Sequence, residues 1–218
     1  MMKPVLTIAL LCAEAETFAQ VESACWEPAL YGVTDGKAVG TYLEHKFQAF
    51  LLSKYVLESG SSAKGIDFPG LNVDMKVTRV SQPQSSCPFR SARQKVFGLG
   101  YGLLIFVYDK VDDDQRRSGR LDILHVMFVE SHRTADFQTT SGLQRILANE
   151  GNLDDVIAFL MERFLPVDDS QAVEIAEEIM NDPPQTGYLT ISNALQWRLQ
   201  YRRVIDVAGL VEGVHKVL

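Results

Sequence analysis

The sequence predicts an α/β (mixed α+β) fold, with a central mixed β-sheet flanked by helices and a helical C-terminal region. Three observations predict this class. Gly65–Thr78 alternates polar and apolar residues around a turn, which is typical of a two-stranded hairpin. Tyr101–Asp109 and Leu121–Val129 are nearly continuous apolar runs, as in strands covered on both faces. From Thr140 onward the periodicity is helical.

Two helices are predicted before the hairpin. The apolar spacing of Pro4–Cys25 suits one amphipathic helix, and Trp26–Gly40, rich in Gly, Pro and Asp, is predicted to be a loop. Gly40–Glu58 is predicted to be the second helix. Its apolar stripe consists of Leu43, Phe47, Phe50 and Leu51.

The N-terminal apolar run Val5–Cys12, which follows Lys3, superficially resembles a signal peptide. The run is short and continues into ETFAQVESA with helical spacing, so we expect a helix of the mature fold instead. No apolar segment approaches the roughly 20 residues of a membrane span.

After the hairpin, Val80–Phe89 is polar and contains proline, so it is predicted to be a loop. Ser91–Gly98 is predicted to be a short helix that Ser91 caps. Lys110–Arg120 is then a charged turn between the two apolar strands. These segments connect the predicted strands of the sheet.

The C-terminal part is predicted to be helical, with a Pro183-Pro184 break before the last helix. The four predicted helices are Gly142–Asn149, Leu153–Phe164, Ser170–Asn181 and Thr190–Val204. We therefore expect a core with its N-terminal helix over residues 1–140. Residues 141–218 would form a helical region that packs on the core or serves dimerisation or DNA contact.

The composition is ordinary for a globular protein: 218 residues, 46% hydrophobic and 22% charged. A net charge of −7 argues against a protein that coats nucleic acid, but not against a DNA enzyme with local basic surface. The three cysteines form no C-x-x-C motif, which suits a reducing cytoplasm and gives no zinc signature.

The hairpin separates two kinds of side chain. With a turn at Pro69-Gly70 or Gly70-Leu71, Asp67, Asp74 and Lys76 share one face. The opposite face carries Ile66, Phe68, Val73, Met75 and Val77. In the register that pairs the two aspartates, their Cβ atoms would lie about 5 Å apart. Carboxylates that close repel each other, so a divalent cation between them is expected; the alternative is a solvated face whose charges happen to alternate.

This pattern resembles the PD-(D/E)XK nuclease superfamily, whose restriction-endonuclease-like core is a mixed sheet with flanking helices. Asp67 matches the first acid of its motif, and Asp74-x-Lys76 matches (D/E)-x-K. Glu44, in GTYLEHKF, matches an acid that many members carry on the preceding helix. The likeness covers about residues 40–129. Ile66 replaces the usual proline, and the gap between the acids is short, as a tight hairpin requires.

The resemblance implies Mg²⁺-dependent hydrolysis of DNA phosphodiester bonds. Asp67, Asp74 and the main-chain carbonyl of Met75 would bind Mg²⁺, and Lys76 would orient or deprotonate the attacking water. Glu44 would complete a second metal site or bind metal-bound water. Its alternative is a surface helix acid.

A basic helix start follows the hairpin in FRSARQK. By resemblance Gln94 is a candidate active-site residue, and Arg90, Arg93 and Lys95 are candidate phosphate contacts. Gln82 and Gln84 on the preceding loop could read base edges. The alternative for the whole cluster is a solvated helix start.

The last helix interleaves basic and aromatic residues in NALQWRLQYRR. It could bind DNA in the manner of a helix-turn-helix, or Trp197 and Tyr201 could seal a core or a dimer face, which we favour.

The sequence thus predicts a type II restriction endonuclease acting on double-stranded DNA as a homodimer, in the cytoplasm, with a DNA methyltransferase as genetic partner. The alternatives are a repair or junction-resolving nuclease of the same superfamily, or a non-catalytic DNA-binding regulator that uses the C-terminal helices.

Overall fold

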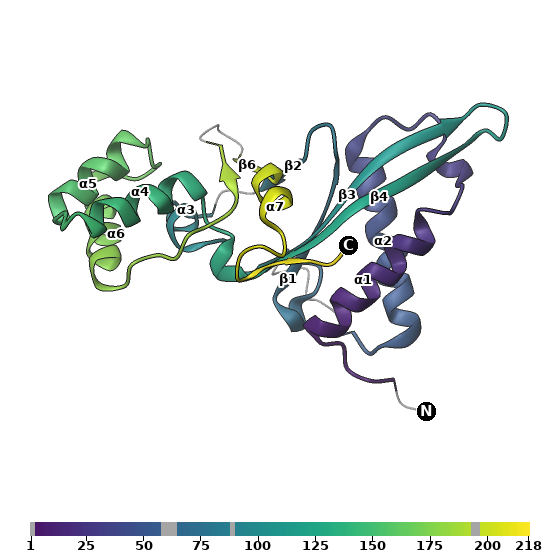
Figure 1. Ribbon diagram of the computed structural model, residues 1–218, viewed down its shortest axis with the longest axis horizontal. Coiled ribbons are helices and arrows are strands. Elements are labelled where there is room, and N and C mark those ends of the chain that lie inside the picture. Colours follow the sequence, from purple (N-terminus) through teal and green to yellow (C-terminus); the bar gives the residue numbers. More distant parts are fainter. Residues whose placement is uncertain (1–2, 58–64, 88–89, 193–196) are drawn as a thin grey trace. The chain divides into compact units, whose positions relative to one another are not determined.

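The computed structural model describes residues 3–57, 65–87, 90–192 and 197–218 (Figure 1). The chain divides into two compact units. The first comprises Met1–Ser85, Gly102–Val129 and Val207–Leu218, and the second comprises Ser86–Tyr101 and Glu130–Asp206. This division differs from the sequence-based one, because the chain enters the second unit twice and residue 140 lies inside a helix.

The first unit is built on a four-stranded mixed sheet of order β1-β3-β4-β7. β1 (Val73–Arg79) runs parallel to β3 (Gly102–Asp113), and β3 runs antiparallel to β4 (Ser118–Val129). β7 (Val214–Lys216) adds to the other side of β4. The predicted fold class, a mixed sheet flanked by helices, is confirmed.

Two helices cover one face of this sheet (Figure 1). They are α1 (Ile8–Glu22), which contacts β4, and α2 (Gly36–Lys54), which contacts β1. The short helix η1 (Pro28–Leu30) lies between them in sequence. At the centre of the core the Phe47 ring lies 5.0 Å from that of Phe18 and 5.4 Å from that of Phe106, centroid to centroid. This aromatic packing fixes α2 against the sheet.

The predicted hairpin is only partly correct. Phe68 and Val73 form a single antiparallel bridge around a turn that contains η2 (Pro69–Leu71) and the left-handed Asn72. No strand precedes the bridge among the residues described from Gly65 onward, and β1 pairs along its length with β3 instead. The register is nevertheless the one predicted for a turn centred on Gly70-Leu71, which places Asp67 across from Asp74.

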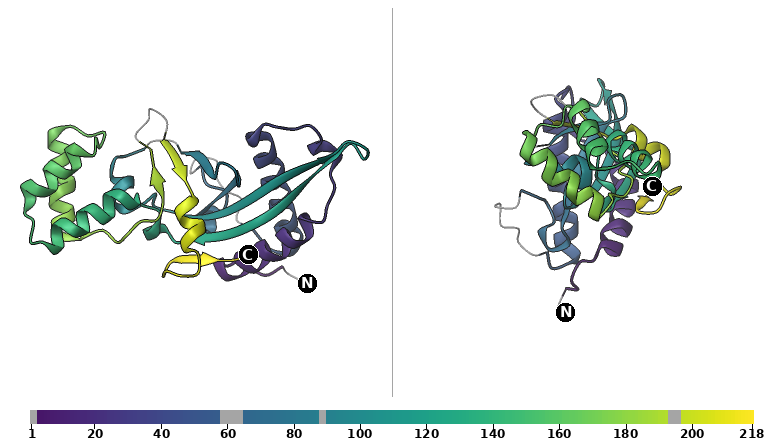
Figure 2. Two further views of the ribbon diagram at one scale, coloured as in Figure 1. Left: turned by 45° about the horizontal axis from the view of Figure 1, so that its top comes forward. Right: turned by 90° about the vertical axis from the view of Figure 1, so that its left-hand side faces the viewer.

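The two central strands are longer than their apolar runs. β3 and β4 extend into the charged segment as a two-stranded ribbon (Figure 2), so only residues 114–117 form the turn. Charged residues such as Lys110 and Arg120 therefore lie in strands, where both are partly buried.

Among the described residues of the second unit, four helices pack around one core, and short strands accompany them. The helices are α3 (Arg93–Phe97), α4 (Phe137–Ala148), α5 (Leu153–Glu162) and α6 (Asp169–Asn181). The short helix η3 (Ser131–Arg133) precedes α4. Leu143, Val156, Leu160, Ile175 and Ile179 form the centre of their common core. These helices confirm most of the helical pattern after residue 140.

A small sheet of order β2-β6-β5 corrects two predictions. β2 (Gln84–Cys87) lies in the segment predicted to be a loop, and Phe89 lies outside the described residues. β5 (Thr190–Ile191), β6 (Trp197–Gln200) and the short α7 (Arg202–Val207) replace the helix predicted at Thr190–Val204, part of which, 193–196, is also outside the described residues. The physical reason is visible in β6, where buried and exposed residues alternate with the period of a strand.

In the parts of the chain that the structure describes, no helix combines the length and the hydrophobicity that crossing a bilayer requires.

Candidate active site

The bridge between Phe68 and Val73 positions the candidate site. One residue beyond it, Asp67 and Asp74 stand opposite each other, because antiparallel register pairs residues on either side of the turn symmetrically. Phe68 and Val73 themselves are buried in the core, with 4% and 1% of their surface exposed. The apolar pair therefore anchors the carboxylate pair, as the alternation predicted.

Asp74 is a buried carboxylate on the edge strand β1, with 5% of its surface exposed. Its Oδ2 atom lies 2.6 Å from Nζ of Lys76. Burial raises the pKa of Asp74 to about 6, an effect that Lys76 opposes and Asp67 reinforces. The carboxylate is thus held charged at neutral pH in surroundings that disfavour the charge.

Asp67 is tied to the same strand from the other side of the turn. Its Oδ2 atom accepts a hydrogen bond of 2.7 Å from the backbone N–H of Met75. Burial raises the pKa of Asp67, and Glu44 raises it further, whereas interactions with Asp74 and the Met75 amide lower it. Asp67 therefore interacts with both of the other candidate acids.

The backbone of Met75 turns its polar groups towards this carboxylate. In a strand, the N–H and C=O of one residue point to the same side. Since the N–H of Met75 reaches Asp67 rather than β3, its carbonyl also points to the open edge of the sheet. The position suits the carbonyl that the sequence analysis selected as a ligand.

Helix α2 brings Glu44 to Asp67, whose pKa is raised by burial and also by Glu44. A polar cluster fixes the rotation of this helix against α1: Nζ of Lys46 lies 2.8 Å from Oε2 of Glu22, and the Tyr42 hydroxyl donates to Glu22 at 2.9 Å. Glu22 is buried, whereas the Lys46 side chain is 37% exposed, so only the carboxylate end of the cluster is shielded from solvent. Lys46 and Glu44 therefore point to different sides of α2.

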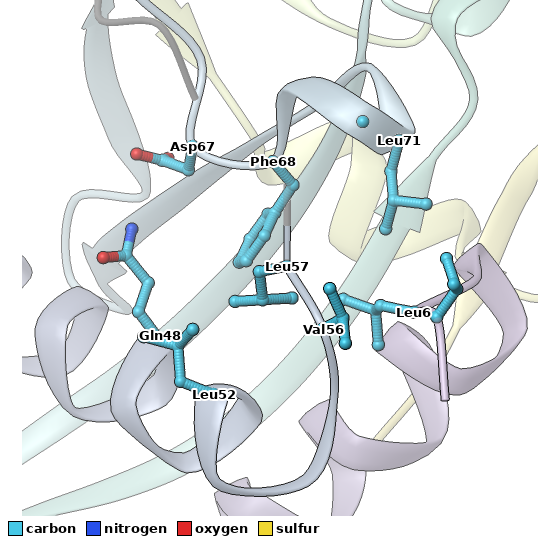
Figure 3. Close-up of a pocket in the computed structure, with 10 residues that line it drawn as sticks. Leu6, Gln48, Leu52, Val56, Leu57, Asp67, Phe68 and Leu71 are labelled. Atoms are coloured by element: carbon cyan, nitrogen blue, oxygen red, sulfur yellow. The ribbon is translucent and has the colours of Figure 1, made fainter. Parts of the chain in front are cut away.

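Gln48, which the sequence analysis did not select, lies one helical turn after Glu44. It borders a pocket of about 290 Å³ together with Asp67. In Figure 3 the Gln48 carboxamide and the Asp67 carboxylate lie on the same side of this pocket. The rest of the lining is mainly apolar, with Leu6, Leu52, Val56, Leu57, Phe68 and Leu71. The i, i+4 spacing from Glu44 was the signal that could have identified Gln48.

The donor set fits a hard divalent cation in its chemistry, because it consists of carboxylate and carbonyl oxygens that repel one another when no cation is present. No group of three or more acidic, histidine or cysteine side chains among the described residues has the geometry of a formed metal site. The reason is local: Asp67 is turned to the Met75 amide and Asp74 to Lys76. Cation binding would require these carboxylates to turn from their present partners.

The remaining predicted residues lie in the second unit or near β2. Gln94 belongs to the second unit, where its Nε2 donates to the Leu99 carbonyl at 3.2 Å. Arg93 pairs with Glu178 on α6, and Lys95 is buried, with 4% of its surface exposed. Arg90 is exposed in the same unit.

Gln82 and Gln84 belong to the first unit; Gln82 precedes β2 and Gln84 is its first residue. Gln82 is exposed, whereas Gln84 is partly buried and its backbone N–H donates to the Thr78 hydroxyl at 2.9 Å. Of these two glutamines, Gln82 is therefore the more exposed to solvent.

In the basic-aromatic segment near the C-terminus, the aromatic side chains are buried and two of the arginines are exposed. Trp197 and Tyr201 are buried, with 3% and 0% exposed, and Arg198 and Arg202 are exposed. Their burial agrees with the prediction that the two aromatic residues pack in a core. Trp197 lies in strand β6 and Tyr201 directly follows it, rather than both lying in a helix. The helix-turn-helix interpretation is wrong, because its second helix is replaced by β5 and β6.

Comparison with known proteins gives a consistent result. A family model described as type II restriction enzyme NspV matches residues 5–216. A curated relative from Nostoc sp., named Type II restriction enzyme NspV, is 61% identical over 210 residues, covering 96% of each chain. No solved structure gives a significant match.

Proposed function

This chain belongs to the type II restriction enzyme NspV family, and on that premise we propose that it cleaves double-stranded DNA by Mg²⁺-dependent hydrolysis at Asp67, Asp74 and Lys76. The observation that carries the proposal is the Phe68–Val73 bridge, which sets the two aspartates opposite each other. Their raised pKa values are typical of functional carboxylates. We assign the site to the PD-(D/E)XK superfamily on this pattern.

Each residue has a distinct role in the proposal. Asp67, Asp74 and the Met75 carbonyl would hold Mg²⁺, which supplies neutralisation of phosphate charge and a more acidic water. Lys76, 2.6 Å from Asp74, orients the attacking water and stabilises negative charge on the phosphate oxygens. Glu44 would accept hydrogen bonds from water at the site or would join Asp67 in holding a second metal ion.

Contacts to DNA are proposed for exposed polar residues near β2 and α3. Arg90 and Gln82 have the exposure that phosphate or base contacts require, and Gln84 would contribute after a side-chain rearrangement. Arg93 would exchange its partner Glu178 for a phosphate, and Gln94 would approach the scissile phosphate. The burial of Lys95 favours a structural role for that residue.

Double-strand cleavage favours a homodimer, because one site per protomer can address each strand. A restriction enzyme also endangers the DNA of its own cell, so a DNA methyltransferase of the same specificity is the expected genetic partner. Both proposals, and a cytoplasmic location where DNA is accessible, follow from the proposed substrate.

The test is cleavage of unmethylated plasmid DNA by purified protein. We expect discrete fragments with Mg²⁺ and none with EDTA, and we expect Asp74→Asn to slow cleavage at least about 1000-fold. Asp109→Asn is the matched control, since Asp109 on β3 also pairs with a cation, Arg79 at 3.3 Å, but stands apart from the site. Equal loss in both variants, or full activity of Asp74→Asn, would overturn the assignment.

A further inference from the structure

A row of alternating cationic and aromatic side chains lies in the second unit. The Arg203 guanidinium is 3.6 Å from the centroid of the Phe137 ring, and the Arg133 guanidinium is 5.7 Å from that of Tyr188. The two rings lie 6.2 Å apart, which joins both pairs. All four side chains are partly exposed. We call Arg133, Tyr188, Phe137 and Arg203 the cation–aromatic row.

Backbone pairing fixes the middle of the row. Tyr188 N–H donates to the Arg133 carbonyl at 2.9 Å, and Phe137 N–H donates to the Leu189 carbonyl at 2.8 Å. The two segments approach so closely at Gly187 that a Cβ there would lie 2.2 Å from the Ala135 carbonyl oxygen. The row is therefore built on rigid backbone, which lowers the entropy that ligand binding would cost.

The charges of the second unit are unevenly distributed. Residues 150–182, which include α5 and α6, carry ten acidic side chains and one basic side chain, Arg163. The row instead contributes two arginines, and the exposed Arg198 lies in the same unit. A polyanion would be repelled by the α5–α6 surface and attracted to the row.

We propose that the cation–aromatic row is a DNA-contacting surface, in which Arg133 and Arg203 bind phosphates and the rings of Tyr188 and Phe137 pack against sugars or bases. The inference rests on the proposed function, since it names a surface for the same substrate. Planar guanidinium groups that stack on rings present several N–H groups at their edges, which suit phosphate oxygens. Arg133 uses one of them, at Nη1, to donate to the Thr186 carbonyl at 3.2 Å. Alternating arginine and aromatic residues are the chemistry that nucleic-acid surfaces use for contact without a deep pocket.

The experiment measures equilibrium binding of a short duplex that contains the mapped cleavage site, in EDTA so that no cleavage occurs. For the double variant Arg133→Gln/Arg203→Gln we expect Kd to rise about 10- to 100-fold. The slope of log Kd against log salt concentration should fall by about 1 to 2, because each lost phosphate contact removes about 0.9. Arg203→Lys should retain the wild-type slope, since it keeps the charge.

Arg163→Gln is the matched control. Arg163 also lies over a ring, 5.6 Å from the Phe159 centroid, but within the acidic segment. We expect its Kd to stay within about twofold of the wild type.

The proposal is overturned if the folded double variant binds with unchanged Kd and salt slope. A lower melting temperature with an unchanged slope would likewise overturn it, because the row would then serve packing alone. This outcome is separable from failure of the proposed catalytic site, which is read from cleavage by Asp74→Asn and not from binding.

Discussion

Asp74 is a buried carboxylate, and the effect of its charge on the free energy of unfolding can be measured. Its ion pair with Lys76, which is about a quarter exposed, contributes at most about 1 kcal/mol. Burial outweighs this contribution, since the pKa of Asp74 is still raised from 3.8 to about 6. The metal-free protein is therefore less stable with this carboxylate charged, as is common at functional sites.

We predict that Asp74→Asn stabilises the metal-free protein by roughly 1–3 kcal/mol at pH 8, because the neutral amide avoids the buried charge. The folded protein binds the Asp74 proton more tightly than the unfolded chain, so the wild type loses stability as pH rises from about 4 to 6. The gain from Asp74→Asn should thus be near zero at pH 4 and complete above about 6.5. Denaturant unfolding in EDTA at several pH values measures it, and a pH-independent difference would argue against a raised pKa.

Ionisation of Asp74, which lowers the stability of the metal-free protein, should increase the cleavage rate. Protons compete with Mg²⁺ for the carboxylates, so the rate at limiting Mg²⁺ should fall as pH decreases through about 6. Saturating Mg²⁺ should shift this fall to lower pH. Single-turnover rates at two Mg²⁺ concentrations measure the shift, and a profile insensitive to Mg²⁺ would exclude competition at these groups.

At the scale of elements, the turn before β1 controls the register of the site. Asn72 adopts φ +54°, a conformation that asparagine and glycine tolerate and β-branched residues do not. We predict that Asn72→Gly changes stability by less than about 1 kcal/mol and retains cleavage. Asn72→Val should lose about 1–2 kcal/mol and reduce cleavage beyond the loss of folded protein, because strain would disturb the pairing of Asp67 with Asp74. Thermal unfolding and specific activity test both variants, and equal activity per folded molecule would contradict the role of the turn.

The sequence predicted elements where local pattern and burial agree. The alternation at 65–78 predicted the division of faces and left two registers open, of which the structure has the one centred on Gly70-Leu71. The apolar runs predicted β3 and β4. The sequence could not show that β1 pairs with β3 rather than with a second hairpin arm, since alternation reports a half-buried strand and not its partner. Near Trp197 and Tyr201 the i, i+4 spacing fits a helix, and only the burial pattern of the folded chain distinguishes β6.

At the scale of the whole molecule, two compact units divide the proposed tasks. The first holds Glu44, Asp67, Asp74 and Lys76. The second holds the fifth candidate, Gln94, together with the cation–aromatic row and the acidic α5–α6 segment. The net charge of −7 does not show how charge is distributed between these surfaces, because ten of the acidic residues lie in residues 150–182. Local charge, rather than net charge, is therefore the relevant quantity for DNA binding.

The most direct test of the central claim, that Asp67 and Asp74 share one cation, is calorimetric titration of Mg²⁺ or Mn²⁺ into the wild type and into the Asp67→Asn/Asp74→Asn double variant. We expect saturable binding by the wild type and by the Asp109→Asn control, and loss of binding by the double variant with its fold intact. Retained cation binding by the folded double variant would contradict the claim.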